Sequence, residues 1–339
     1  MVQVFLKKNT AKAFKTMQLP PDVRAAIETI TGQSGLAALR DAAAAVSARY
    51  RGKARVDAAI KSDDEARAYL GARFPATYAA AYSVLRQVAG VKGDFAPVKL
   101  LDIEAGPGTV ALAALAIWPD LEKIVLVEPN FYLRRAGQEI FKALGVADRV
   151  AWIETAIQSA ELPEADIVTA GYMMNEIIRD DEIEALTAKI WQVTQNTLVM
   201  VEPGTPEGYA IVLRMRDALL KAGAHMVAPC PHSAECPLLG TPAWCHFSAR
   251  VERSKLHRSL KDGAVLGYED EKFSYVAMSR EKAALPGHRV IGYPAGAKIV
   301  QLQLCNQDGT ASTAQIAKSN PQYKLCRKLE WGDAIEDAL

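Results

Sequence analysis

The chain has 339 residues, which at roughly 100 to 200 residues per domain predicts two or three structural units. It is 50% hydrophobic and 23% charged, a globular composition that excludes a disordered chain, a collagen and a coiled coil. Lysine and arginine total 40 against 39 acidic residues, so the overall charge is no reason to expect a nucleic acid or a membrane as partner. No apolar run approaches the roughly 18 residues that cross a bilayer. We expect a soluble monomer with neither a membrane span nor a secretory signal.

The first 95 residues are predicted to form a helical unit. Four stretches begin at a polar residue or a proline and end near a glycine, which are the start and stop signals of helices. Their apolar spacing is that of ordinary helices packed on a core, and we recognise no catalytic group among them. The fourth helix is expected to stop at Gly90. The four predicted helices are 22–30, 34–50, 62–70 and 77–88, and a basic arm with Lys7, Lys8, Lys12 and Lys15 precedes them.

Beyond about residue 97, short apolar runs alternate with helical stretches. Such alternation predicts a doubly wound α/β core with a largely parallel sheet. The predicted strands are 98–103, 124–127, 150–153, 167–170 and 198–201, and the predicted helices between and after them are 109–118, 131–144, 182–193 and 208–222. After Met226 the alternation stops, and strand-like pieces follow at 244–251, 273–278 and 298–305.

These patterns divide the chain into three predicted domains. The first is the helical N-terminal domain, residues 1–95. The second is the α/β core, residues 96–282, which contains a cysteine-rich insertion at 229–262. The third is a small β-rich C-terminal domain, residues 283–339.

A glycine loop, LDIEAGPGT at residues 101–109, follows the first predicted strand and opens a helix. Backbone N–H groups at such a loop can hold a nucleotide-like ligand. Glu128 closes the second strand 20 residues after Gly108, where a carboxylate can accept hydrogen bonds from ribose hydroxyls. The spacing of Gly106, Gly108 and Ala111 fits a nicotinamide-binding loop, but Asp102 and Pro107 favour the loop of class I S-adenosylmethionine methyltransferases. A turn that only joins strand to helix is the alternative.

One residue departs from this methyltransferase pattern. Glu104 stands where the loop normally has its first glycine, and its carboxylate would crowd the ligand and repel the methionine carboxylate of the methyl donor. We therefore expect Glu104 to weaken or abolish donor binding. No catalytic dyad is recognisable near the loop.

The segment after the fourth predicted strand, residues 171–176, is expected at the lip of the same crevice. Tyr172 in this segment is a candidate contact to cofactor or substrate. Asn175 and Glu176 could serve the same purpose or cap the following helix. The candidate cofactor-binding residues are thus Asp102, Gly106, Gly108, Glu128 and Tyr172.

All five cysteines lie in the last third of the chain, at 230, 236, 245, 305 and 326. An odd number without a secretory signal argues against a disulfide framework and favours thiolates gathered on a metal. Prolines punctuate the segment of the first three, so a helix cannot carry those cysteines apart. Zinc takes four ligands and could use His232 or His246, whereas an iron-sulfur cluster prefers four cysteines. The spacing leaves both metals open, and inert buried cysteines are the third alternative.

A basic run follows the first three cysteines. In the sequence it is opposed only by Glu252 and Asp262. Lysine and arginine at this density can neutralise the phosphates of RNA, and a solvated helix face is the alternative. The candidate RNA-binding residues are Arg250, Arg253, Lys255, Arg258 and Lys261, and the tail adds Lys318, Lys324, Arg327 and Lys328.

Several stretches carry a resemblance to a known family. They are VEPGTPEG at 201–208, APCPH at 228–232, WCHFS at 244–248, YEDEKFSY at 268–275, CNQDG at 305–309 and WGD at 331–333. With them the chain resembles, over residues 20–335, the methyltransferase-like family associated with the small ribosomal subunit of mitochondria, including its bacterial members. The resemblance implies a class I methyltransferase fold and association with small-subunit rRNA during assembly. It also implies a 4Fe-4S cluster on Cys230, Cys236, Cys245 and Cys305, with Cys326 to spare.

Three functions are compatible with these features. The first is transfer of a methyl group from S-adenosylmethionine to small-subunit rRNA, with the loop and Glu128 holding the donor. The second is a ribosome assembly factor without catalysis, in which the cluster orders an RNA-binding surface on a degenerate methyltransferase scaffold. The third and weakest is a nicotinamide-dependent oxidoreductase. We expect the cytoplasm for a bacterial protein, with the mitochondrial matrix as the alternative.

Overall fold

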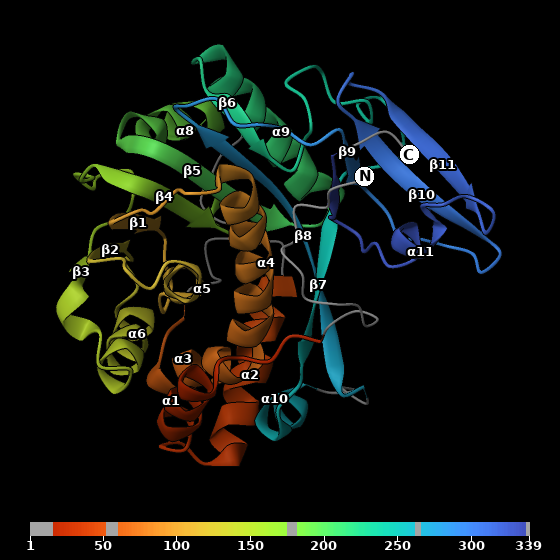
Figure 1. Cartoon of the computed structure of the whole chain (residues 1–339). Helices are drawn as coiled ribbons and strands as arrows, with labels where there is room; N and C mark the ends of the chain where they lie inside the picture. The colour runs from red at the N-terminus through yellow and green to blue at the C-terminus, as the bar shows by residue number, and fades with distance from the viewer. Residues whose placement is uncertain (1–15, 52–59, 175–181, 262–265, 337–339) are drawn as a thin grey trace.

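The computed structural model describes residues 16–51, 60–174, 182–261 and 266–336. The lysines of the basic arm and the pair Asn175–Glu176 lie outside these residues. Within them the chain forms two sheets with helices around the larger one (Figure 1). In the part of the chain so described, no helix is long and apolar enough to cross a membrane.

Four helices precede the first strand, as predicted. Ser62 fixes the start of the third because its side chain accepts a hydrogen bond of 3.2 Å from a backbone N–H in the first turn. The expected stop of the fourth helix at Gly90 is wrong. That helix continues to Gly93, whose φ of 59° suits a residue without a side chain, because Val91 is still buried in the core. The helices are α1 (Pro21–Thr31), α2 (Leu36–Arg51), α3 (Asp63–Ala72) and α4 (Phe74–Lys92).

The main sheet has the strand order β3-β2-β1-β4-β5-β8-β6, with β7 paired to β8. Strands β1 to β5 run parallel, and β8 is antiparallel to both β5 and β6. An antiparallel strand inserted between the fifth and sixth strands is the topology of class I methyltransferases, so the predicted fold class is confirmed. The strands are β1 (Lys99–Ile103), β2 (Lys123–Val127), β3 (Val150–Ile153), β4 (Ala165–Gly171), β5 (Thr194–Pro203), β6 (His225–Ala228), β7 (Phe247–Glu252) and β8 (Tyr268–Ser279).

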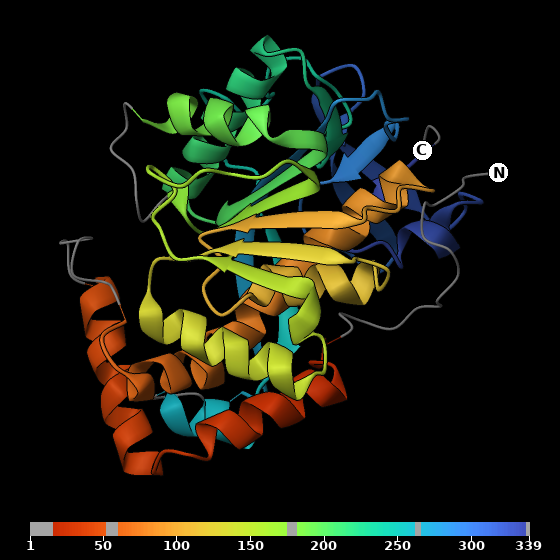
Figure 2. The same ribbon diagram turned by 90° about the vertical axis from the view of Figure 1, so that its left-hand side faces the viewer.

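Helices cover both faces of this sheet (Figure 2). Because successive strand residues point to opposite faces, Leu100 packs on the side of α4 and α5, whereas Leu101 packs on the side of α8 and α9. The core on the α5 side also contains Ile27 and Leu70, so the N-terminal helices share a core with the sheet. The helices of the sheet are α5 (Thr109–Ile117), α6 (Phe131–Ala143), α8 (Ile183–Gln192) and α9 (Pro206–Lys221), with a short 3-10 turn η2 (Ala147–Arg149) before β3.

A second, antiparallel sheet of order β11-β10-β9-β12 ends the chain (Figure 1). It confirms the predicted β-containing C-terminal module. Its small core includes Leu302, Tyr323 and the fully buried Cys326. The elements are β9 (His288–Val290), β10 (Ile299–Asn306), β11 (Ala311–Ala317), α11 (Tyr323–Cys326) and β12 (Ala334–Ile335).

Candidate functional site

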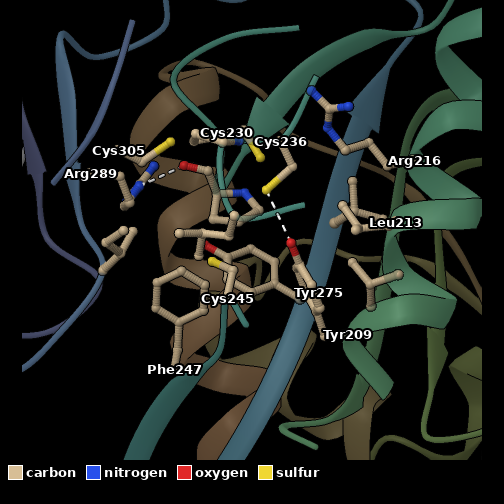
Figure 3. Close-up of a pocket in the computed structure, with 16 residues that line it drawn as sticks. Tyr209, Leu213, Arg216, Cys230, Cys236, Cys245, Phe247, Tyr275, Arg289 and Cys305 are labelled. Carbon is tan, nitrogen blue, oxygen red and sulfur yellow. Dashed lines mark hydrogen bonds between the residues drawn. The ribbon is translucent and has the colours of Figure 1, made fainter. Parts of the chain in front are cut away.

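Four of the five cysteines line one pocket between the main sheet and the C-terminal sheet (Figure 3). Cys230 follows β6, Cys236 lies in the loop beyond it, Cys245 precedes β7, and Cys305 is on β10. The cavity that remains between the side chains is small, about 30 Å³. Cys326 lies in the core of the second sheet instead. The fold thus brings together the four cysteines that the resemblance implied and leaves the fifth apart.

Burial and the charges of neighbouring cysteines favour the protonated form of Cys230, Cys245 and Cys305. Burial first, and the charges of neighbouring cysteines next, raise the pKa of Cys305 to about 12. The same two causes, with Cys230 contributing most among the cysteines, raise the pKa of Cys245 well above its ordinary value. The four thiols are thus neighbours on the wall of one pocket. A bound cation would favour the thiolate form that ligates metals.

Two polar side chains contact the thiols directly. Tyr209 Oη on α9 lies 3.2 Å from Cys236 Sγ, and His232 Nε2 lies 3.2 Å from Cys305 Sγ. Burial lowers the pKa of His232, so its ring favours the neutral form, in which one nitrogen donates a hydrogen bond. His246, the other histidine considered as a zinc ligand, stacks on Trp244 and meets Trp331 edge to face.

The donor set fits a thiolate-bound metal group. Across the described residues, no three histidine, cysteine or acidic side chains already form a site for a single metal ion, so the four thiols share a pocket rather than a finished coordination sphere. Four cysteines can ligate either a tetrahedral zinc ion or a 4Fe-4S cluster. Either group would tie β10 of the C-terminal sheet to the loop that follows β6.

The glycine loop lies at the carboxyl end of β1, the edge where open α/β sheets bind ligands. Gly108 has a φ of 81°, and a Cβ there would stand 2.4 Å from the ring of Phe141, so the position requires glycine. Gly106 has a φ of 56° and open space on its Cβ side. Behind the loop, buried Asp102 accepts a hydrogen bond of 2.7 Å from the Thr169 hydroxyl. Burial raises the pKa of Asp102 to about 7.

Glu128 is only 5% exposed, and both of its carboxylate oxygens already bind the backbone nearby. They accept hydrogen bonds of 2.7 Å from the backbone N–H groups of Gly106 and Asn130. Burial, and next the charge of Glu104, raise the pKa of Glu128 to about 8. Glu104 itself has a φ of 50°, a backbone region that favours glycine. A ribose would therefore compete with these N–H groups and meet a second carboxylate nearby.

Tyr172 follows β4 and also has a positive φ, 61°. The guanidinium of Arg73 lies 5.5 Å from the centre of its ring, and Arg73 forms an ion pair of 2.8 Å with Glu271. Burial, and next the charge of Glu271, raise the pKa of Tyr172 well above its ordinary value. Arg73 thus links the ring of Tyr172 to Glu271 on β8.

Much of the basic run is paired inside the protein. Glu269 on β8 forms ion pairs with Lys261 at 2.5 Å, with His257 at 2.8 Å and with Arg253 at 3.6 Å. Burial alone would raise the pKa of Glu269, but the hydrogen bonds from His257 and Lys261 outweigh it and lower the pKa to about 2. Arg250 is likewise paired with the next β8 residue, an aspartate, at 2.6 Å. These acids follow the run in the chain and meet it only because β7 and β8 pair.

Two residues of the run are exposed. Lys255 and Arg258 lie on α10 (Lys255–Leu260), and neither forms an ion pair with a carboxylate of the described residues. The four basic residues of the tail are exposed as well. Asp262, one of the two acids near the run in the sequence, lies outside the described residues.

Strand order, glycine loop and four-cysteine pocket together define a methyltransferase-fold protein with a thiol-rich centre. Residues 63–336 match the family described as mitochondrial small ribosomal subunit Rsm22. The chain belongs to this family.

Curated relatives are similar at moderate identity. The human ribosome assembly protein METTL17, mitochondrial, is 25% identical over 292 residues, which cover 79% of this chain and 61% of the human protein. The Rsm22-cox11 tandem protein 2, mitochondrial, of Schizosaccharomyces pombe is 28% identical over 195 residues, 52% of this chain and 26% of that protein. The chain thus spans less than two thirds of the length of these relatives.

Solved methyltransferases are similar at low identity. A SAM-dependent methyltransferase from Aquifex aeolicus has a TM-score of 0.41 and 12% identity, over 65% of this chain and 99% of that one. Magnesium protoporphyrin IX methyltransferase from Synechocystis PCC 6803 has a TM-score of 0.40 and 10% identity, over 69% of this chain and 91% of that one. Such likeness is slight, and the class I assignment rests on the strand order of this chain.

Three polar residues on the pocket wall were not predicted from the sequence. They are Tyr209, Arg216 and Arg289. Arg289 lies in the three-residue strand β9 (HRV), where its neighbours give no sequence signal of a buried charge. Nothing in the sequence links α9, which carries the other two, to the cysteines.

Proposed function

We propose that the chain associates with the small ribosomal subunit as an assembly factor and binds its RNA. A 4Fe-4S cluster on Cys230, Cys236, Cys245 and Cys305 holds the RNA-binding part in place. The observation that carries the proposal is the meeting of four cysteines from separate parts of the fold at one pocket. Family membership and the name of the human relative, a ribosome assembly protein, support the ribosomal partner.

The cluster acts as a staple in this proposal. The C-terminal sheet has a small core of its own, and small units commonly depend on a metal or a disulfide for stability. Ligation joins Cys305 on β10 to three cysteines next to the main sheet, so metal binding and docking of the C-terminal sheet become one equilibrium. When bound, the cluster supplies strong iron-sulfur bonds across this junction.

In this proposal the exposed lysines and arginines contact the RNA, and the ion-paired residues of the basic run do not. Arg253 and Lys261 are held by Glu269, and Arg250 by its aspartate neighbour. Exposed lysines and arginines can neutralise phosphates and release counterions. The proposed RNA-contacting residues are Lys255, Arg258, Lys318, Lys324, Arg327 and Lys328.

The metal is tested by measuring iron, acid-labile sulfide and zinc, with the visible absorption spectrum, on protein purified without oxygen. Near-equal iron and sulfide with no zinc is the expected result. Zinc alone would overturn the cluster and leave a structural zinc site on the same four cysteines. Absence of both metals would remove the staple altogether.

The RNA surface is tested by binding small-subunit rRNA at two salt concentrations. We expect Lys255→Glu with Arg258→Glu, and separately Lys324→Glu with Arg327→Glu, to weaken binding and to flatten its salt dependence. Arg250→Gln is the matched control, because its charge is already balanced on β8. An equal loss of RNA binding in Arg250→Gln would indicate that the ion-paired residues contact the RNA instead. Unchanged binding in all variants would overturn RNA contact through these cations.

Methyl-donor binding is a second candidate, favoured by one observation at the glycine loop. Asp102 Oδ2 and Thr109 Oγ1 are buried without hydrogen-bond partners, and buried polar atoms normally have them. Two observations argue against this candidate. The carboxylate of Glu128 already accepts two backbone hydrogen bonds, and Glu104 places a second negative charge nearby. Calorimetric titration with S-adenosylmethionine decides: heat of binding would support an rRNA methyltransferase, and its absence a degenerate scaffold. A parallel titration with NAD tests the oxidoreductase alternative.

The place of action follows from the proposed partner. The relatives' names assign them to mitochondria. We propose that this chain works where its small subunit is assembled, in a bacterial cytoplasm or in the mitochondrial matrix.

A further inference from the structure

Two buried arginines stand on the wall of the four-cysteine pocket (Figure 3). Arg289 on β9 is 1% exposed and lies opposite Cys305 in the β9–β10 pairing. Arg216 on α9 is 3% exposed. Burying a guanidinium is unfavourable by several kcal/mol unless an anion and hydrogen bonds compensate it. The compensation of these two charges therefore needs an explanation.

The hydrogen bonds of Arg289 all go to neutral groups. Nε donates to the carbonyl of Pro229 at 2.7 Å, and Nη1 donates to the carbonyl of Gly332 at 2.8 Å and to the side-chain oxygen of Gln87 at 2.7 Å. Nη2 is buried without a hydrogen-bond partner. Among the described residues, no carboxylate forms an ion pair with Arg289.

Arg216 shows the same pattern in weaker form. Nη2 donates to the carbonyls of Ala234 at 2.5 Å and His232 at 3.4 Å. Nη1 lies 3.1 Å from the carboxylate of Asp217, whose side chain is 59% exposed and solvated. Nε is buried without a hydrogen-bond partner. A solvated carboxylate compensates a buried charge poorly.

We infer that Arg216 and Arg289 are the counter-charges of a thiolate-bound metal group in this pocket. This inference rests on the proposed function. Four thiolates around a doubly positive 4Fe-4S core, or around a zinc ion, carry two negative charges in total, which two guanidinium groups balance. The unpartnered Nη2 of Arg289 and Nε of Arg216 supply donors on the wall of this pocket.

The same arginines position the ligands. Arg289 holds the carbonyl of Pro229, the residue before Cys230. Arg216 holds two carbonyls between Cys230 and Cys236. These hydrogen bonds order the cysteine loop before metal binds. The conformational-entropy cost of metal binding is therefore lower.

The test uses the full chain, purified with its metal, and two readouts: the rate at which a chelator removes the metal, and the midpoint reduction potential. We expect Arg289→Met and Arg216→Met each to speed metal loss roughly tenfold, since a charged hydrogen bond contributes about 1.5 to 3 kcal/mol. Loss of a nearby positive charge also lowers the reduction potential. Arg289→Lys keeps the charge but not the guanidinium hydrogen bonds. Its reduction potential should therefore be closer to the wild-type value than its rate of metal loss.

Arg134→Met is the matched control. Arg134 is also buried and also donates to two backbone carbonyls, but it pairs with Glu154 and lies on α6, outside the pocket lining. It should lose stability without a change in either readout. If Arg289→Met does not fold, Arg216→Met decides alone.

The outcomes separate this inference from the proposed function. Wild-type protein with an iron-sulfur cluster, and arginine variants with unchanged metal loss and potential, would overturn the inference alone. Equal effects in the Arg134 control would reduce both arginines to a structural role. Wild-type protein with zinc would overturn the cluster, and the chelator assay on zinc would still decide the inference. Wild-type protein without metal would overturn both.

Discussion

The four-cysteine pocket and the glycine loop both follow from short sequence patterns, yet the structure treats their polar groups differently. At the pocket, Arg216 and Arg289 keep buried donors without partners. At the loop, the carboxylate expected to receive a ribose is already bound to two backbone N–H groups. A buried polar group without a partner points to a missing ligand, whereas a satisfied one does not. Asp102 Oδ2 and Thr109 Oγ1 beside the loop are also buried without partners, so the two sites differ in one respect: the expected ribose acceptor at the loop is already engaged.

The largest expected effect comes from removing one thiol of the pocket. Cys305→Ser should lose most of the bound metal and release the C-terminal sheet, a destabilisation on the order of several kcal/mol because metal binding is coupled to folding. Metal content and limited proteolysis of residues 283–336 measure both effects. Cys326→Ser is the control and should keep its metal, because that thiol lies in a separate core. Full metal in Cys305→Ser, or loss of metal in the control, would break the assignment of ligands.

The next effect concerns the part of the basic run that is paired with Glu269, namely Arg253, His257 and Lys261. The pKa of Glu269 is about 2 against an ordinary 4.5, so its stabilisation is present above pH 4.5 and is lost as the pH falls toward 2. Its side chain is 17% exposed, and we expect about 2 kcal/mol from this shift after allowing for solvent screening.

Denaturant unfolding at pH 6 and pH 3 measures this loss. Glu269→Gln should show a smaller pH dependence than the wild type. Asp270→Asn removes the more exposed neighbouring ion pair and should cost less than about 1 kcal/mol. An equal pH dependence in Glu269→Gln and the wild type would mean that the three cations do not depend on Glu269.

A smaller effect tests the loop itself. Glu104→Gly should stabilise the protein by about 1 kcal/mol, because glycine adopts the φ of 50° without strain. If the loop is otherwise competent, the same change should restore binding of S-adenosylmethionine in a calorimetric titration. Ala105→Gly is the control and should only destabilise, since its φ is not positive. If Glu104→Gly gains stability but does not bind S-adenosylmethionine, the loop is only a turn that joins β1 to α5.

The smallest effect is electrostatic and also lies at the loop. Glu104→Gln removes the charge that helps raise the pKa of Glu128 to about 8. A raised pKa contributes stability below the ordinary value of 4.5 that is lost as the pH rises through 8. The variant should therefore lose less stability than the wild type between pH 5 and pH 8, by about 1 kcal/mol or less. Parallel pH profiles would show that the two carboxylates do not interact.

Much of the fold was predictable because its patterns are local. The alternation of apolar runs and helical stretches located all five parallel strands to within a few residues. The end of α4 was not predictable, because Gly90 reads as a stop and only the burial of Val91 shows that the helix continues. The sites were predictable where residues lie close in the chain, as in the glycine loop and the first three cysteines.

Other features depended on contacts between distant residues. The pairing of β7 with β8 brings Glu269 to the basic run, which within the sequence is opposed only by Glu252 and Asp262. The contact of Tyr172 with Arg73, which is itself paired with Glu271 on β8, likewise follows from packing.

By itself the sequence determined the class I core, the glycine loop, the exceptional Glu104 and the concentration of cysteines in the last third of the chain. These are local properties of composition, spacing and periodicity. Spacing left the fourth cysteine open and only the resemblance implied Cys305, whereas the tertiary structure places Cys305 beside the other three and Cys326 in a separate core. It also placed two buried arginines beside them and turned Glu128 toward its own loop. The reason is physical: whether a polar group keeps capacity for a ligand depends on every partner that folding brings to it.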